Sequence, residues 1–163
     1  MKTIMIARHA KSDWGMGFPD HDRPLSSRGK KDAPRMGRAI NGLGFLPDLI
    51  VTSSAVRAKA TADKVAKEVG YQQPLIVDPR LYGAGHEAVA LMLQALPDKV
   101  GKAMIFGHNP ILEQLVAHLL QMAGGIVIPT SGMVCMEAQI QSWADLAPGQ
   151  CRLKWFLIPK LLP

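Results

Sequence analysis

The chain has 163 residues, 48% of them hydrophobic, which suits one domain with a sizeable core, and we expect residues 1–163 to form it. No apolar run reaches the roughly 20 residues of a membrane helix, and charged residues follow the short apolar N-terminal stretch at once, so we expect a cytoplasmic protein without a membrane partner. The net charge of +6 favours anionic partners, but the basic residues are dispersed and form no nucleic-acid-binding motif, which argues against nucleic acid.

The first predicted strand and helix are separated by a long loop. An apolar run at residues 3–7 predicts a buried strand, and glycines and prolines make residues 8–25 a loop. A helix follows, capped by Ser26 or Ser27 and ending near Gly44, although a proline lies inside its apolar pattern.

The middle of the chain repeats this alternation of strand and helix. Residues 49–52 predict a second buried strand, and small apolar residues on one face predict a helix over 55–69, with Ser54 as its N-cap. Residues 75–77 predict a short third strand, and a helix over about 86–96 follows it.

The last third of the chain changes character. A strand over residues 103–106 leads to a helix that opens at Asn109-Pro110, with the asparagine as cap, and ends at Gly124-Gly125. Two late strands over 133–140 and 152–158 have the pattern of an antiparallel pair at a sheet edge. The sequence therefore predicts an α/β protein, a three-layer α/β/α sandwich with a mostly parallel central sheet and an antiparallel edge from the C-terminal strands.

Basic and imidazole side chains follow three of the predicted strands. Arg8 and His9 come directly after the first strand, Arg57 lies in the first helical turn after the second, and His108 follows the fourth. A histidine at a strand end is more often structural, and Arg57 alone could be an exposed, solvated arginine. Because the carboxyl ends of parallel strands meet at one edge, however, we expect these four groups to gather beside helix N-termini and bind an anion such as phosphate.

Four motifs carry a family resemblance, in the order in which they occur. They are Arg8-His9-Ala10-Lys11-Ser12, Asp22-Arg23-Pro24-Leu25-Ser26 with Gly29, Ser53-Ser54-Ala55-Val56-Arg57-Ala58 with Thr61, and Gly107-His108-Asn109-Pro110. The ordered set resembles the histidine phosphatase (phosphoglycerate mutase-like) superfamily. The short length resembles the bacterial protein-phosphohistidine phosphatases, which act on histidine phosphotransfer signalling domains.

The resemblance implies covalent catalysis in two steps. His9 would be the nucleophile that becomes phosphorylated, Arg8 and Arg57 would hold the phosphoryl oxygens, and His108 would bind the group from the other side. Water would then release inorganic phosphate. The mechanism implies no metal and no cofactor, and Cys135 and Cys151, which lack metal-ligand spacing, are interpreted as buried free thiols.

The resemblance is incomplete at the proton donor. Many superfamily members carry a glutamate acid where this chain has Leu81-Tyr82-Gly83, and Glu87 or His86 just beyond could substitute for it. Arg23 and Ser26 are weaker candidates for supporting or rim positions. Without a strong acid, an alkoxide is difficult to expel, whereas an imidazole can leave neutral.

These arguments predict a metal-independent phosphatase for phosphohistidine on a protein, of the histidine phosphotransfer signalling type. A phosphatase for a small phosphorylated metabolite is the alternative enzyme. A catalytically weak phosphoprotein-binding module is the alternative from another class, although binding alone does not require the nucleophile.

Overall fold

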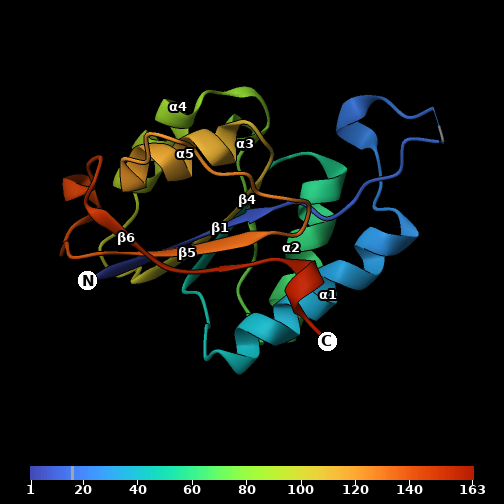
Figure 1. The fold of residues 1–163 in the computed structure, drawn as a ribbon, viewed down its shortest axis with the longest axis horizontal. Helices are drawn as coiled ribbons and strands as arrows, with labels where there is room; N and C mark the ends of the chain where they lie inside the picture. The colour runs from blue at the N-terminus through green and yellow to red at the C-terminus, as the bar shows by residue number, and fades with distance from the viewer. Residues whose placement is uncertain (16) are drawn as a thin grey trace.

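The computed structural model describes residues 1–15 and 17–163, and this part of the chain contains one six-stranded sheet in the order β3-β2-β4-β1-β5-β6 (Figure 1). The strands are β1 Lys2–Arg8, β2 Leu49–Thr52, β3 Ile76–Val77, β4 Lys102–Gly107, β5 Met133–Ala138 and β6 Cys151–Leu157. β1, β4, β2 and β3 run parallel, whereas β5 is antiparallel to both β1 and β6. The predicted mostly parallel sheet with an antiparallel C-terminal edge is confirmed.

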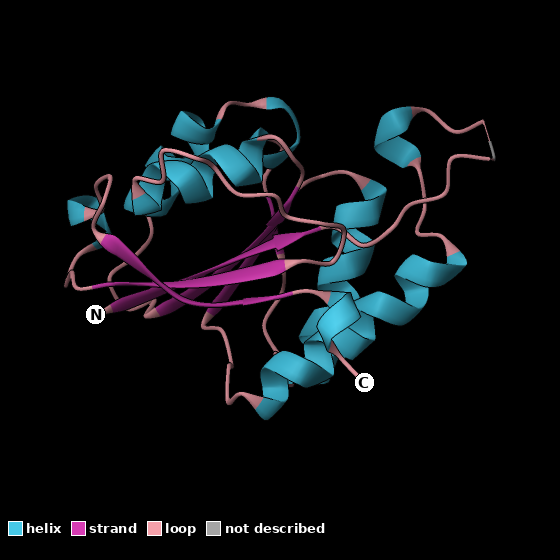
Figure 2. Cartoon of the chain, viewed as in Figure 1, coloured by secondary structure: helices cyan, strands magenta, loops and turns pink. Residues whose placement is uncertain are grey.

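Helices cover both faces of the sheet, which gives the three predicted layers (Figures 1 and 2). They are α1 Ser27–Gly42, α2 Val56–Val69, α3 Arg80–Gly83, α4 His86–Gln94 and α5 Ile111–Leu120, with 3-10 turns η1 Asp20–Asp22, η2 Trp143–Asp145 and η3 Pro159–Leu161. α1 and α2 lie on one face, and α3, α4 and α5 lie on the other. None of these helices has both the length and the apolar character that crossing a membrane requires.

Strand β1 lies inside both halves of the core. Ile4 and Ile6 pack with α4 and α5, whereas Met5 and Ala7 pack with α1 and α2. Successive strand residues point to opposite faces, so a strand that is covered on both sides reads as a continuous apolar run. This burial fixes the position of Arg8, the last residue of the strand, at the edge of the sheet.

Helix α1 begins as predicted and ends two residues earlier. The Ser26 hydroxyl accepts a hydrogen bond from the Gly29 N–H at 3.2 Å, so Ser26 is the N-cap. Pro34 lies inside the helix although it has no N–H to donate to the preceding turn. The helix nonetheless continues through this position, because its buried face packs against the core. The last helical residue is Gly42, and the left-handed Gly44 lies beyond the cap.

Two predicted caps are wrong. Ala55 is the N-cap of α2 and makes no side-chain cap bond, while the Ser54 hydroxyl lies 3.0 Å from His21 Nε2. Pro110, not Asn109, is the N-cap of α5, because the Asn109 amide is engaged elsewhere, donating to Glu113 at 2.6 Å. In both places another partner binds the side chain that the local pattern assigned to the cap: His21 for Ser54, and Glu113 together with the Ile128 carbonyl for Asn109.

Several predicted boundaries also differ. α5 ends at Leu120 because Gln121 adopts a left-handed conformation, with φ of 51°, several residues before Gly124-Gly125. α4 ends at Gln94, and β5 ends at Ala138. The single-turn α3 and the three short turns were missed, because one turn of helix is too short to show an apolar period.

Candidate active site

The four predicted residues come together at the carboxyl ends of the parallel strands. Arg8 ends β1 and His9 follows it, His108 follows β4, and Arg57 is the second residue of α2, which follows β2. They share a cavity of about 260 Å³. Its lining consists of Arg8, His9, Lys11, Ser12, Trp14, Arg23, Arg57, His108, Asn109 and Thr130. The short connections between these strands and helices place all four groups at one sheet edge, as the sequence predicted.

His9 is buried, and its hydrogen bonds fix the position of its proton. Nδ1 lies 2.8 Å from the carbonyl oxygen of Ala10, which can only accept, so Nδ1 carries the hydrogen and Nε2 carries the lone pair. Burial, with the nearby charges of Arg57 and Arg8, lowers the pKa of His9 to about 4. His9 therefore presents a neutral, nucleophilic Nε2 to the cavity at neutral pH.

His108 lies beside His9, with ring centroids 5.0 Å apart. Its Nε2 is 2.8 Å from the Ser53 hydroxyl, and its buried Nδ1 has no partner among the described residues. Burial and the nearby His9 and Arg57 lower its pKa to about 3, so this ring is also neutral.

Arg57 is almost completely buried and contacts His9 directly. Its Nε donates to His9 Nε2 at 3.3 Å, and its two terminal nitrogens donate to Asp20, to the carbonyl oxygen at 2.5 Å and to Oδ2 at 3.1 Å. Arg8 donates from Nη1 to the carbonyl of Ile128 at 2.8 Å, while its buried Nε has no partner in the described structure. Arg57 thus contacts the lone pair of His9, and Arg8 lines the same cavity.

Asp20 is a site residue that the sequence analysis missed. Its carboxylate accepts hydrogen bonds from Arg57, from Arg23 at 2.8 Å and from the Tyr82 hydroxyl at 2.9 Å. The hydrogen bond from Tyr82, followed by those from the arginines, lowers the pKa of Asp20 to about 2. Asp20 lies in a loop without periodicity, so only its position in a Pro-Asp-His-Asp-Arg cluster before the predicted helix could have drawn attention to it.

Arg23 and Ser26, which were paired as weaker candidates, occupy different environments. Arg23 is 6% exposed, lines the cavity, donates to the Ser12 hydroxyl and stacks on the Trp14 ring at 3.5 Å from its centroid. Ser26 caps α1 and donates to the carbonyl of Lys11 at 3.0 Å. Arg23 thus adds a cation to the cavity, and Ser26 ties α1 to the loop that carries Lys11.

Glu87, the candidate proton donor, does not line the cavity. It lies in the first turn of α4 with its side chain 72% exposed, and its carboxylate is 3.3 Å from His86 Nδ1. Tyr82, in the segment where the resemblance led us to expect an acid, donates its hydroxyl hydrogen to Asp20, and this bond raises the pKa of Tyr82.

Metal-ligand clusters and reactive thiols are not part of this arrangement. Over residues 1–15 and 17–163, no three histidine, cysteine, aspartate or glutamate side chains lie together in a way that could hold a metal ion. Cys135 and Cys151 are buried and unbridged, as predicted, and burial raises the pKa of each thiol to about 11.

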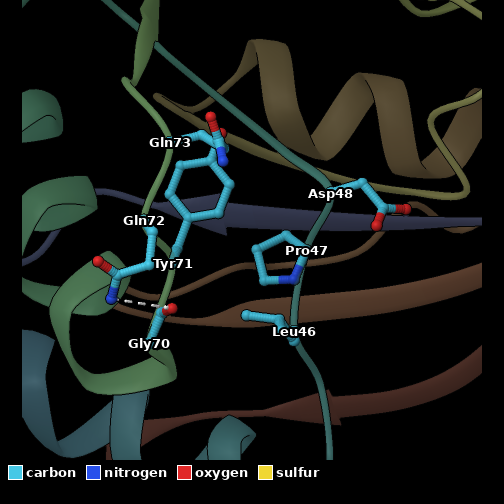
Figure 3. Close-up of a pocket in the computed structure, with 7 residues that line it drawn as sticks. All are labelled: Leu46, Pro47, Asp48, Gly70, Tyr71, Gln72 and Gln73. Carbon is cyan, nitrogen blue, oxygen red and sulfur yellow. Dashed lines mark hydrogen bonds between the residues drawn. The ribbon is translucent and has the colours of Figure 1, made fainter.

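A second hollow, of about 320 Å³, lies away from these groups (Figure 3). Its walls are Leu46-Pro47-Asp48, just before β2, and Gly70-Tyr71-Gln72-Gln73, just after α2. Asp48 Oδ2 already accepts hydrogen bonds from the N–H groups of Gly101 and Lys102, at 2.9 and 2.8 Å. No catalytic set is assembled there among the described residues, so the cationic cavity is the candidate active site.

Parallel strands with imidazole and guanidinium groups at their carboxyl ends define an α/β protein with a cationic pocket at one edge of the sheet. The chain belongs to the histidine phosphatase superfamily (branch 1), whose family model matches residues 4–85. This finding confirms the resemblance carried by the sequence motifs.

Similar proteins cover almost the whole chain. An uncharacterized protein of Mycobacterium tuberculosis (strain ATCC 25618 / H37Rv) is 31% identical over 162 residues, which cover 94% of this chain and 99% of that protein. The solved structure of the protein histidine phosphatase SixA complexed with tungstate has a TM-score of 0.85 at 22% identity, over 97% of each chain. A mycobacterial glucosyl-3-phosphoglycerate phosphatase complexed with VO3 has a TM-score of 0.73 at 16% identity, over 95% of this chain and 98% of that one. At these identities the two structures share the fold.

Proposed function

We propose that this chain is a phosphatase that hydrolyses phosphohistidine on a protein, through a covalent phosphohistidine intermediate on His9. Membership of the histidine phosphatase superfamily supports phosphoryl transfer as the class of chemistry. The neutral Nε2 of His9, contacted by Arg57 in a cavity that Arg8 also lines, supports the assignment of the nucleophile.

The first step transfers the phosphoryl group to the enzyme. His9 Nε2 forms a bond to phosphorus as the bond from phosphorus to the substrate nitrogen breaks, and the substrate imidazole leaves neutral when its far nitrogen carries a proton. Guanidinium groups on the equatorial oxygens stabilise the transition state.

The second step releases phosphate. Water attacks phosphorus, gives its proton to the phosphate product or to solvent, and the bond to His9 Nε2 breaks. Because Nδ1–H of His9 is held on the Ala10 carbonyl, His9 also leaves as a neutral imidazole and needs no proton donor.

The observation that carries the substrate class is the protonation state of Asp20, which is not part of the cavity lining but whose carboxylate accepts hydrogen bonds from two arginines of that lining. Asp20 contacts Arg57, Arg23 and Tyr82, and its pKa of about 2 keeps it ionised, so it holds no proton to give to a leaving group at neutral pH. Glu87 lies outside the cavity lining. General acid catalysis raises a reaction rate by about 10²–10⁴-fold. Without it, expulsion of an alkoxide loses this acceleration, whereas expulsion of an imidazole loses less of it.

The test compares kcat/KM for a phosphorylated histidine phosphotransfer domain, phosphoglycerate and an aryl phosphate at one pH. We expect the phosphoprotein and the aryl phosphate, whose leaving group needs little protonation, to react faster than phosphoglycerate. An equal kcat/KM for phosphoglycerate would contradict the proposed substrate class and favour a small-metabolite phosphatase. Glu87→Gln would then be the next variant to measure, because Glu87 is the candidate proton donor.

The nucleophile is tested with the same substrates. His9→Ala should abolish turnover with the fold intact, and the wild type should carry an acid-labile radiolabel on His9 after reaction with labelled substrate. Full activity in His9→Ala would refute the mechanism. Tight binding of the phosphoprotein without turnover of any of the three substrates by the wild type would instead identify a binding module.

A further inference from the structure

The described structure leaves four buried side-chain polar atoms without a partner, and all belong to residues of the active site or next to it. They are Arg8 Nε, His108 Nδ1, Asn109 Oδ1 and Ser131 Oγ. His108 Nδ1 is distinctive because the other nitrogen of its ring is fixed by Ser53. A buried polar atom without a partner costs about 1–3 kcal/mol, so such an atom in a ligand cavity indicates where a ligand atom belongs.

The hydrogen bonds of Ser53 determine which nitrogen of His108 carries the proton. The Ser53 hydroxyl is fully buried, and it accepts a bond from the Ala55 N–H at 3.2 Å. Its one hydrogen then remains to be donated, and His108 Nε2 lies 2.8 Å away. If the hydroxyl donates to Nε2, the hydrogen of the neutral ring is on Nδ1.

The other tautomer leaves more groups unpaired. If Nε2–H donated to Ser53, the hydroxyl hydrogen would need another acceptor, and the described structure provides none. Both that hydrogen and the Nδ1 lone pair would then be buried and unsatisfied. In the Nδ1–H tautomer of His108, the only unpaired group of this pair is the Nδ1–H donor, and an oxyanion in the cavity supplies the acceptor for it.

We propose that Ser53 is a positioning residue that holds His108 in the Nδ1–H tautomer, so that Nδ1 donates a hydrogen bond to the phosphoryl group. This inference rests on the proposed function, since it names the atom by which the same site binds its substrate. The pKa of His108, about 3, keeps the ring neutral at neutral pH, where the choice of tautomer decides between donor and acceptor.

The two adjacent histidines then perform opposite tasks with the same tautomer. In His9 the Nδ1–H is bound to the Ala10 carbonyl, which leaves the lone pair on Nε2, where the Arg57 Nε–H contacts it at 3.3 Å. In His108 the Nε2 lone pair is bound to Ser53, which frees Nδ1–H for donation. The backbone partner of one ring and the hydroxyl partner of the other thus produce a nucleophile and an oxyanion donor side by side, with ring centroids 5.0 Å apart.

The experiment measures imidazole ¹⁵N shifts of histidine-labelled protein, with the His108 signals assigned by their loss in His108→Asn. We expect a protonated Nδ1 and an unprotonated Nε2 on His108 in the wild type. Ser53→Ala should shift population to the Nε2–H tautomer and weaken vanadate binding about tenfold. Ser53→Thr, which keeps the hydroxyl, should restore both. Ser54→Ala is the matched control and should change neither, because the Ser54 hydroxyl contacts His21.

A protonated Nε2 on His108 in the wild type would overturn the proposal, as would an unchanged tautomer and unchanged vanadate affinity in a folded Ser53→Ala. If Ser53→Ala does not fold, the wild-type spectrum alone decides. The tautomer is measured without substrate. A failure of the tautomer proposal is therefore distinct from a failure of the protein to hydrolyse phosphohistidine.

Discussion

Arg57 contacts both the proposed nucleophile, His9, and the loop that carries Asp20. Arg57→Ala should weaken the binding of vanadate or phosphate by about 1.5–3 kcal/mol, the scale of hydrogen bonds to charged groups. Competitive inhibition of phosphatase activity measures the effect. Arg38→Ala is the matched control, since Arg38 pairs with Glu68 on the surface and its removal changes the net charge equally.

An equal loss of affinity in Arg38→Ala would show that net charge, not the cavity, binds the anion. Chelators should leave the activity unchanged, since the proposed steps use only side chains of this chain. Activity that disappears with EDTA and returns with zinc or magnesium would contradict the metal-independent mechanism.

Two buried histidines give the stability a defined dependence on pH. The pKa values of His9 and His108 fall from 6.5 to about 4 and about 3 on folding, so below pH 6.5 the unfolded chain binds protons that the folded chain does not. The free energy of unfolding should therefore fall as the pH drops from 6.5 toward 4, by up to about 1.4 kcal/mol per pH unit for each histidine.

Urea unfolding at about pH 7 and about pH 5 measures this fall. Asp20 makes its contribution at lower pH, because its pKa moves from 3.8 to about 2 and its stabilisation is lost only as pH falls through that range. His9→Ala should show a smaller fall than the wild type. A wild type equally stable at both pH values would contradict the depressed pKa values.

Three of the four main site residues that the sequence predicted share one property. Arg8 ends β1, and His9 and His108 directly follow β1 and β4, so their position at the sheet edge follows from the parallel topology alone. Asp20 and Tyr82 meet through a contact between segments far apart in the chain, and no local pattern encodes that contact.

At the scale of the helix, Gly29 allows α1 to lie against the loop below the cavity. A Cβ at Gly29 would collide with the carbonyl oxygen of Lys11, whereas a Cβ at Gly42, in the last turn of the same helix, would meet nothing within 4 Å. Gly29→Ala must displace the backbone that leads from His9 to Ser12. It should lower the stability by about 1–3 kcal/mol, the range for overpacking, and weaken vanadate binding.

Gly42→Ala is the control in the same element. It should leave the stability unchanged or raise it by up to about 1 kcal/mol, because alanine is the better helix former. Urea unfolding and vanadate titration of both variants provide the comparison. A Gly29→Ala protein as stable and as tightly binding as Gly42→Ala would show that the loop adapts at no cost.

The sequence predicts the helices that are longer than about two turns, but it predicts where they begin and end less well. The apolar faces of α1, α2 and α5 have the helical period because each packs on the sheet. Caps depend on single side chains, and Ser54 and Asn109 find tertiary partners instead. α3 has one buried residue, Leu81, and so no period to detect.

For the whole molecule, the layers and the antiparallel edge were predictable, but the order of strands was not. Alternating strands and helices indicate a parallel sheet with two covered faces, and the change of pattern after α5 indicates a different edge. Nothing local shows that β4 pairs with both β1 and β2, because that pairing joins segments distant in sequence.

The pairing of β1 with β4 joins Thr3 to Lys102 and Arg8 to Gly107. Closing so long a loop costs conformational entropy before any contact compensates for it, and folds with such contacts form slowly compared with helical bundles. The cavity that holds His9 and His108 exists only after this closure. During synthesis the proposed nucleophile His9 therefore remains exposed, with the pKa of an ordinary imidazole, until β4 has left the ribosome.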